Sequence, residues 1–302
     1  GIAFAGLQWR QANMFRSMNA ELEEANGFLA TISMKISKYL SPQIYKSIFS
    51  GEKDVVISTE RKKLTIFFSD IKDFTETAEH LQPEELTNLL NEYFTEMSVI
   101  AHAHGATVDK FIGDAILAFF GDPETRGARE DANACLDMAI AMQRRMGELK
   151  GEWRRRGIEK PFEVRMGINT GYCNVGNFGS ADRMDYTIIG AEANLAARLQ
   201  GIAEPGGIVI SYETWAHVQD RVRVHRLDPI TLKGISGEIV PYAVDGLAEN
   251  APGETPGSST INEESEGLHL RLDLDRLDED ARRRAEAALE KALGVLRRGG
   301  DE

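Results

Sequence analysis

Apolar strands and amphipathic helices alternate in one fixed order through the middle of this 302-residue sequence, and that order limits the fold. The order is strand, helix, strand, strand, helix, strand, and each helix repeats apolar side chains at a helical spacing. A Gly-Asp turn at residues 113–114 joins the second and third strands as a hairpin. The segments expected to form these elements are Lys63–Ser69, Glu84–Ala103, Thr107–Phe111, Ala115–Phe120, Arg129–Leu149 and Glu163–Asn169.

This β-α-β-β-α-β order is typical of ferredoxin-like α+β folds. A further alternation follows it, and its strands complete a mixed sheet. Ser211 is placed to cap a short helix that reaches Val218. The remaining segments are the strands Cys173–Phe178, Gly207–Ile210, Val222–Leu227, Ile230–Lys233 and Val240–Val244, and the helix Glu192–Ile202.

A seven-residue repeat occupies residues 15–39, and we assign residues 1–50 to a signalling helix that forms a coiled coil. Apolar residues there are spaced alternately by three and four, which is typical of a dimeric coiled-coil seam. Pro42 is expected to end the helix. The alternative is an amphipathic helix that packs on its own domain. The seam residues are Phe15, Met18, Leu22, Ala25, Leu29, Ile32, Ile36 and Tyr39.

Four further segments complete the expected organisation. Residues 51–61 connect the helix to a folded domain at residues 62–247. Residues 248–266 are rich in Pro, Gly, Ser and Glu, which indicates a flexible linker. In residues 267–302, leucines alternate and a helical pattern follows, which predicts a strand and a helix.

Charge and composition exclude several classes of protein. A net charge of −13 argues against a nucleic-acid-binding surface, which needs clustered Lys and Arg. The two cysteines, Cys135 in a helical pattern and Cys173, form no disulfide framework or metal motif, so a cytoplasmic setting is expected for the domain. The sequence starts without Met on an apolar GIAFAGLQW, which we interpret as the end of an upstream sensor domain or of a membrane helix.

Two aspartates mark the candidate chemistry. Asp70 ends the first apolar strand, and Asp114 lies in the turn of the hairpin. If the two strands are neighbours in the sheet, the carboxylates stand side by side and repel each other unless a divalent cation lies between them. Each aspartate alone would be an ordinary turn residue, but the pair favours a metal site.

Four motifs in this order and spacing resemble the catalytic domain of class III adenylyl/guanylyl cyclases, from about Lys62 to Leu247. The resemblance implies dimeric sites at which ATP, or GTP, is cyclised. It also implies two Mg²⁺ or Mn²⁺ ions held by Asp70, Asp114 and the carbonyl of Ile71, with the backbone through Phe74 and Thr75 around the phosphates. The motifs are FSDIKDFT, DKFIGDA, RMGINTG and GAEANLAARL.

The resemblance assigns four more residues to the phosphates and the ribose. It implies that Arg165 and Lys233 contact the triphosphate. Asn194 and Arg198, four residues apart on one helix face, would orient the ribose and stabilise the transition-state phosphate. The alternative for each is an exposed polar residue without a role.

Base choice rests on Lys110 and Thr187. Lys only donates hydrogen bonds, which suits adenine N1 and opposes the N1–H of guanine. Guanylyl cyclases of the family commonly have Glu at the position of Lys110. Many adenylyl cyclases have Asp at the position of Thr187, so this chain resembles the subgroup that includes bicarbonate-responsive soluble cyclases. A hydroxyl both accepts and donates, so it separates the bases less firmly.

The sequence therefore predicts an adenylate cyclase that works as a homodimer and is regulated through its N-terminal helix. One alternative is a guanylate or dual-specificity cyclase. The other is a catalytically silent, cyclase-like module that only dimerises.

Overall fold

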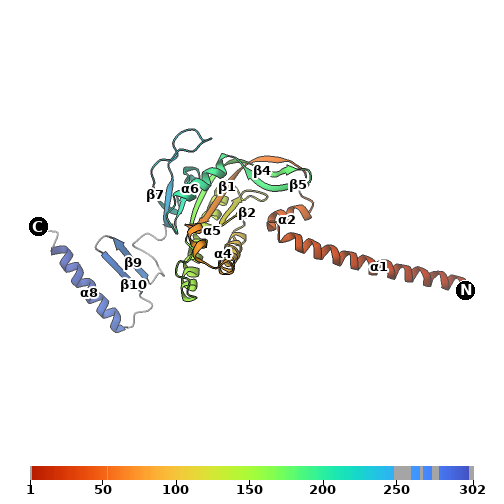
Figure 1. The fold of residues 1–302 in the computed structure, drawn as a ribbon, viewed down its shortest axis with the longest axis horizontal. Coiled ribbons are helices and arrows are strands. Elements are labelled where there is room, and N and C mark those ends of the chain that lie inside the picture. The colour runs from red at the N-terminus through yellow and green to blue at the C-terminus, as the bar shows by residue number, and fades with distance from the viewer. Residues whose placement is uncertain (1, 53, 248–259, 266–267, 274–278, 299–302) are drawn as a thin grey trace. The chain divides into compact units, whose positions relative to one another are not determined.

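The computed structural model divides the chain into two compact units, Gly1–Gly246 and Leu247–Glu302, and each is described by itself (Figure 1). Within the described residues no helix is long and apolar enough to cross a membrane. The residues described are 2–52, 54–247, 260–265, 268–273 and 279–298.

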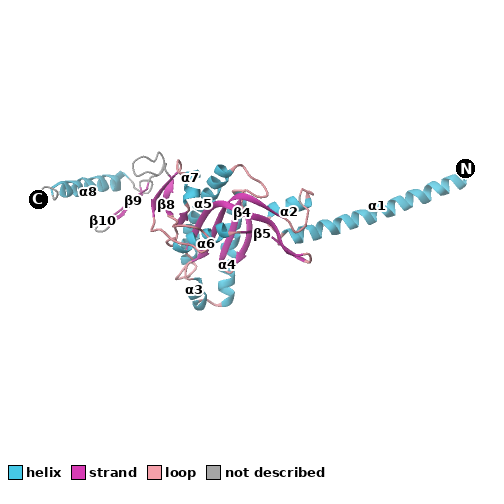
Figure 2. Cartoon of the chain, turned by 90° about the horizontal axis from the view of Figure 1, so that it is seen from above, coloured by secondary structure: helices cyan, strands magenta, loops and turns pink. Residues whose placement is uncertain are grey.

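One mixed sheet forms the centre of the first unit (Figure 2, magenta). Its strand order is β2-β3-β1-β4-β6-β8-β7, with β5 paired to β4. The first four strands of that order have the ferredoxin-like arrangement, so the α+β prediction is confirmed. The strands are β1 (Thr59–Ile71), β2 (Thr107–Ile112), β3 (Ala115–Phe120), β4 (Val164–Ser180), β5 (Arg183–Ile189), β6 (Ile208–Ile210), β7 (Val222–Arg226) and β8 (Tyr242–Leu247). The helices are α1 (Ile2–Ser37), α2 (Pro42–Phe49), α3 (Phe74–His80), α4 (Pro83–Ala103), α5 (Ala128–Arg155), α6 (Ala191–Ile202) and α7 (Tyr212–Val218).

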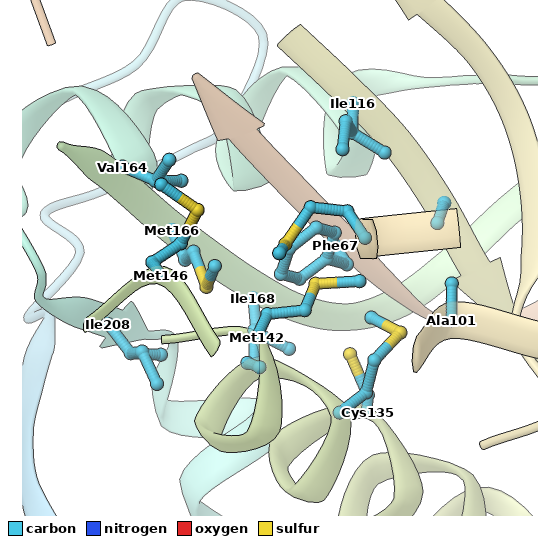
Figure 3. Packing of buried hydrophobic residues seen from close by; sticks show 14 of the residues in the cluster. Phe67, Ala101, Ile116, Cys135, Met142, Met146, Val164, Met166, Ile168 and Ile208 are labelled. Carbon is cyan, nitrogen blue, oxygen red and sulfur yellow. The ribbon is translucent and has the colours of Figure 1, made fainter. Parts of the chain in front are cut away.

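The central strand β1 is buried on both faces of the sheet. On one face Phe67 packs in a cluster with residues of α4 and α5, among them Cys135 and Met142 (Figure 3). On the other face Leu64 and Ile66 pack with side chains of β3, β4, β5 and α6. Burial on both faces explains why the segment is an unbroken apolar run. Cys135, which the sequence places in a helical pattern, is fully buried in this core.

The N-terminal helix α1 ends at Ser37, and a second helix begins after a short turn. Ser41 caps α2 by accepting a hydrogen bond from the amide of Ile44, and Pro42 occupies its first turn. Proline fits that position because its missing N–H needs no partner there. Pro42 therefore opens a helix, and the first helix ends earlier than predicted. Tyr39 lies outside both helices.

The structure differs from the sequence predictions at five further places in the first unit. The first strand begins at Thr59, inside the expected connector. The helix α3 and the strand β5 were not predicted. The strands expected at 163–169 and 173–178 are one strand, β4. The expected strand at Ile230–Lys233 is reduced to a single bridge between Ile230 and Ile239.

The second unit contains an antiparallel pair, β9 (Thr260–Ser265) and β10 (Leu268–Asp273), and the helix α8 (Glu279–Arg298). The strand and the helix predicted from the leucine alternation are thus present. The strand β9 falls within the segment expected to be a linker, so the prediction was wrong for residues 260–265, whereas residues 248–259 and 266 lie outside the described residues. The sequence of β9 is mostly polar and has no strand pattern. Its pairing with β10 is made by backbone groups, which any residue except proline can supply.

Candidate active site

Antiparallel pairing brings the two predicted metal-binding aspartates to the same end of two neighbouring strands. Ser69 of β1 pairs with Ile116 of β3, so the end of β1 lies beside the turn that precedes β3. There Asp114 Oδ2 accepts a hydrogen bond from the backbone amide of Ile71, at 2.9 Å. Asp70 and Asp114 therefore lie on neighbouring chain segments, as expected if these strands are adjacent.

Arg165 is the direct partner of Asp70. The two residues pair across the ladder between β1 and β4, and the guanidinium donates from Nη2 to Oδ2 at 3.0 Å and from Nε to Oδ1 at 3.2 Å. Their side chains are only 22% and 25% exposed. Burial raises the pKa of Asp70, the Arg165 guanidinium opposes that rise, and the Asp114 charge adds to it. The guanidinium thus supplies the positive charge that the buried carboxylate needs.

A hollow of about 560 Å³ lies in front of these groups, a size that suits a small-molecule ligand. Asp73 adopts a left-handed backbone conformation, φ 51°, and α3 starts directly after it. The ring of Phe74 packs edge-on against Phe162, so this side chain is held against the core. The hollow is lined by Asp70, Ile71, Asp73, Phe74, Thr75, Glu76, Glu79, Asp114 and Arg165.

The donor set of this hollow fits a divalent cation that brings ligands of its own. No group of three His, Cys, Asp or Glu side chains able to hold a metal occurs among the described residues. Two carboxylates and the Ile71 carbonyl are nevertheless hard oxygen donors of the kind that Mg²⁺ prefers. Mg²⁺ typically binds one or two carboxylates and completes its shell with water and substrate phosphates. The phosphate oxygens of a nucleoside triphosphate would supply the remaining ligands of the cation.

The two residues assigned to the base meet at a third residue, Asp109. Thr187 Oγ1 donates to Asp109 Oδ2 at 2.5 Å, and Lys110 Nζ lies 3.6 Å from Asp109 Oδ1. The Asp109 side chain is only 1% exposed. Burial raises the pKa of Asp109, while Thr187 and Lys110 oppose the rise. One buried carboxylate therefore links β2 to β5.

Asp109 was missed in the sequence because strand alternation separates it from Lys110. Neighbouring residues of a regular strand point to opposite faces. The ladder between β2 and β3 is irregular between Val108 and Lys110, and Asp109 occupies that irregularity. Such bulges re-aim side chains, and a hairpin sequence does not reveal them.

Close packing of α6 against β4 explains two residues of the RMGINTG motif. A Cβ at Gly167 would stand 2.3 Å from the carbonyl oxygen of Ala196, so glycine is required for this approach. The buried amide of Asn169 donates to the backbone and side-chain oxygens of Glu192, at 3.1 and 2.6 Å. These contacts fix the start of α6 on the sheet.

The opposite face of α6 carries Asn194 and Arg198, and both are exposed. Lys233 is also exposed, in the segment between β7 and β8. Its neighbour Leu232 packs against the cluster that contains Leu195 of α6. Lys233 is therefore held on the side of the molecule where α6 lies. Within the described part of the chain none of the three has a hydrogen bond or an ion pair.

The structure thus places the predicted residues in three groups. The first lines the acidic hollow, the second surrounds Asp109, and the third is the exposed set on and near α6. None of the described pockets is lined by residues of more than one group.

Comparison with known proteins gives consistent relatives. Adenylate cyclase 1 of Rhizobium meliloti (strain 1021) is 32% identical over 235 residues, which cover 76% of this chain and 34% of that protein. This chain therefore spans about a third of the length of that relative. The crystal structure of the adenylyl cyclase CyaB from P. aeruginosa is 54% identical, with a TM-score of 0.60, and covers 62% of this chain and 96% of its own.

A second solved structure, the guanylyl cyclase Cya2, is 36% identical with a TM-score of 0.60, over 65% of this chain and 98% of its own. The family model of the adenylate and guanylate cyclase catalytic domain matches residues 56–246, which is more than half of the chain. The four motifs lie inside that range, at the end of β1, in the β2–β3 hairpin, in β4 and in α6, and the sheet has the expected ferredoxin-like order. The chain belongs to the adenylate and guanylate cyclase catalytic domain family.

Proposed function

We propose that this chain is an adenylate cyclase that converts ATP to 3′,5′-cyclic AMP and pyrophosphate. The observation that carries the proposal is the joint presence of a carboxylate pair with Arg165 and of a Lys110–Asp109–Thr187 cluster on one chain. The first set suits a metal–triphosphate, and the second suits a purine whose N1 accepts a hydrogen bond. The likeness to an adenylyl cyclase at 54% identity supports the same substrate.

The reaction is an internal displacement at phosphorus. The ribose 3′-oxygen attacks the α-phosphorus, the bond to the pyrophosphate oxygen breaks, and in the overall balance the 3′-hydroxyl proton leaves with the pyrophosphate. Asp70, Asp114 and the Ile71 carbonyl would hold two divalent cations, Mg²⁺ or Mn²⁺, which polarise the 3′-oxygen and neutralise phosphate charge when bound. The protein itself contributes mostly positioning and charge stabilisation.

Four polar residues would contact the phosphates and the ribose. Arg165, which pairs with Asp70, would contact the triphosphate. Lys233 adds a second contact to the triphosphate. Asn194 orients the ribose, and the planar fork of Arg198 stabilises the charge that develops on the transferred phosphate.

Two chains are needed for one site. The acidic hollow lacks Asn194, Arg198 and Lys233, which are exposed and without partners in the described part of the chain. In a two-fold dimer, one subunit would supply Asp70, Asp114 and Arg165, and the other would supply the base-binding and transition-state residues.

The N-terminal helix would hold and regulate this dimer. Its seam is uncovered in the single chain: Phe15, Leu22 and Leu29 are 63%, 59% and 62% exposed. A second copy of the helix would bury that seam as a coiled coil. An upstream sensor in a longer, cytoplasm-facing protein would then act through its register. The length of the Rhizobium relative supports additional domains.

A product assay tests the activity. Purified protein is incubated with ATP or GTP and Mg²⁺ or Mn²⁺, and cyclic AMP, cyclic GMP and pyrophosphate are quantified. The proposal predicts cyclic AMP and equimolar pyrophosphate, both abolished by EDTA. The likeness to the guanylyl cyclase Cya2, at 36% identity, favours the alternative of a guanylate or dual-specificity cyclase. That alternative predicts cyclic GMP at a comparable rate. A silent dimerisation module predicts neither product.

A further inference from the structure

We propose that Asp109 is a specificity-determining positioning residue, which makes Thr187 a one-way hydrogen-bond acceptor and thereby selects adenine over guanine. The inference rests on the proposed function, because it concerns how the same site separates two purines. It assigns a role to a residue that contacts no substrate itself.

The first step is the direction of one hydrogen bond. Thr187 Oγ1 and Asp109 Oδ2 are 2.5 Å apart. An ionised carboxylate only accepts, so the hydroxyl must donate its single proton to Asp109. Charge-assisted O–H···O⁻ bonds of this length are the strong ones. The hydroxyl proton is therefore committed, and only the lone pairs of Thr187 are left for a ligand.

The second step is the confinement of the carboxylate. The Asp109 side chain is 1% exposed, and Thr187 is 8% exposed. Lys110 Nζ lies 3.6 Å from Asp109 Oδ1, and that oxygen has no hydrogen-bond partner of its own. Among the described residues, the Lys110 ammonium is the cation that pairs with Asp109. The ion pair favours the ionised form, which is the form that can only accept.

The third step is the match to the purine edge. A neutral threonine hydroxyl could donate to guanine O6 or accept from the adenine amino group. When the hydroxyl donates its proton in the hydrogen bond to Asp109, it can only accept from a ligand. This suits the adenine N6 amino group and leaves guanine O6 facing a lone pair. Lys110 keeps donors for adenine N1. Asp109 thus removes the ambiguity that a hydroxyl at this position would otherwise have.

The test compares kcat/KM for ATP with kcat/KM for GTP in matched variants. Asp109→Asn keeps the shape, but its amide can donate to Thr187 and free the hydroxyl proton. We expect the ATP:GTP ratio to fall roughly tenfold, the usual effect of one lost or reversed hydrogen bond. Thr187→Val should lower the ratio similarly, and Thr187→Ser should keep it. Asp182→Asn, in the exposed β4–β5 turn, is the control and should leave the ratio unchanged.

The double variant distinguishes positioning from a general defect. Because Asp109 acts through the hydroxyl, Asp109→Asn combined with Thr187→Val should show the ratio of Thr187→Val alone. A ratio within twofold of wild type in Asp109→Asn would overturn the inference. If Asp109→Asn does not fold, an unchanged ratio in Thr187→Val overturns it instead. Wild-type protein that forms no cyclic AMP contradicts the proposed function, which is a separate outcome.

Discussion

The acidic hollow and the exposed face of α6 differ in how completely their polar groups are paired. In the hollow, Asp70 has two hydrogen bonds from Arg165, and Asp114 accepts one from the backbone of Ile71. On α6, Asn194 and Arg198 are exposed and have no partner in the described residues. The two aspartates of the hollow are therefore paired within the chain, whereas Asn194 and Arg198 are not.

This difference fits the proposed dimer, in which each chain would supply two complementary half-sites. Buried charges need a partner at all times, so the hollow carries its own counter-charge in Arg165. Exposed charged side chains are solvated by water, so they can remain unpaired with little loss of folding free energy. Substitutions in the hollow should therefore affect both stability and activity, whereas substitutions on α6 should affect activity alone.

The largest effect is expected in the hollow. Asp70→Ala or Asp114→Ala removes a proposed metal ligand, and turnover should fall by more than about 10³-fold because metal and electrostatic stabilisation would carry most of the proposed chemistry. Asp137→Ala is the matched control, since Asp137 also holds an arginine, Arg221, at 2.9 Å but lies outside the hollow. The measurement is the rate of cyclic AMP formation. Normal turnover in either hollow variant would refute the metal assignment.

The next effect belongs to α6. Arg198→Ala should lower kcat by roughly 10²–10³, the usual cost of one lost transition-state contact. The melting temperature should stay unchanged because the side chain is exposed. Arg129→Ala, another exposed arginine, paired with Asp220, serves as the control for kcat. A large loss of stability in Arg198→Ala would show that α6 is not the passive face described here.

A smaller effect separates the two regions by stability. Arg165→Met leaves Asp70 partly buried without its counter-charge, so the metal-free protein should lose about 1–3 kcal/mol at neutral pH. Burial already raises the pKa of Asp70, and loss of Arg165 raises it further. The penalty applies to the ionised form, so it should shrink as the pH falls through that raised pKa. Urea denaturation at several pH values measures it, and a pH-independent loss contradicts the pairing argument.

The smallest effect on the catalytic domain is expected from the N-terminal helix. Leu29→Asn with Ile32→Asn should weaken dimerisation or uncouple regulation, because both residues lie in the seam. Phe28→Asn is the control: Phe28 is 65% exposed and lies next to the seam but outside it. Sedimentation at several concentrations reports the dimer affinity. If removal of residues 1–49 leaves both affinity and activity unchanged, the helix is a passive spacer.

The sequence predicted the central fold well because periodicity and burial agree there. The segments of β1, α4 and the hairpin carry patterns set by the core itself. It failed at β4, where two strands were predicted with Gly171 between them. Both Gly171 and Gly176 lie within the one strand: a Cβ would stand 2.5 Å from the Glu192 side chain at Gly171 and 2.2 Å from the Ser58 carbonyl at Gly176. Such close approaches are tertiary contacts that local composition does not reveal.

The candidate site divides in the same way. Motif resemblance was enough to propose Asp70, Asp114 and Arg165, and strand pairing then placed them together. Asp109 could not be proposed, because its link to Thr187 joins residues 78 positions apart through a bulge. Resemblance names residues that take part in chemistry, whereas the residues that position them depend on contacts between distant strands.

Mixing two inactive variants tests the central claim, that each site is shared between two chains. Asp70→Ala damages one half-site and Arg198→Ala the other, so each homodimer should be inactive or nearly so. In a mixed dimer one site collects both damaged halves, and the other collects both intact halves. With free exchange about half of the dimers are mixed, so cyclic AMP formation should recover to roughly a quarter of the wild-type rate. No recovery, although native mass spectrometry detects the mixed dimers, would mean that the site is built within a single chain.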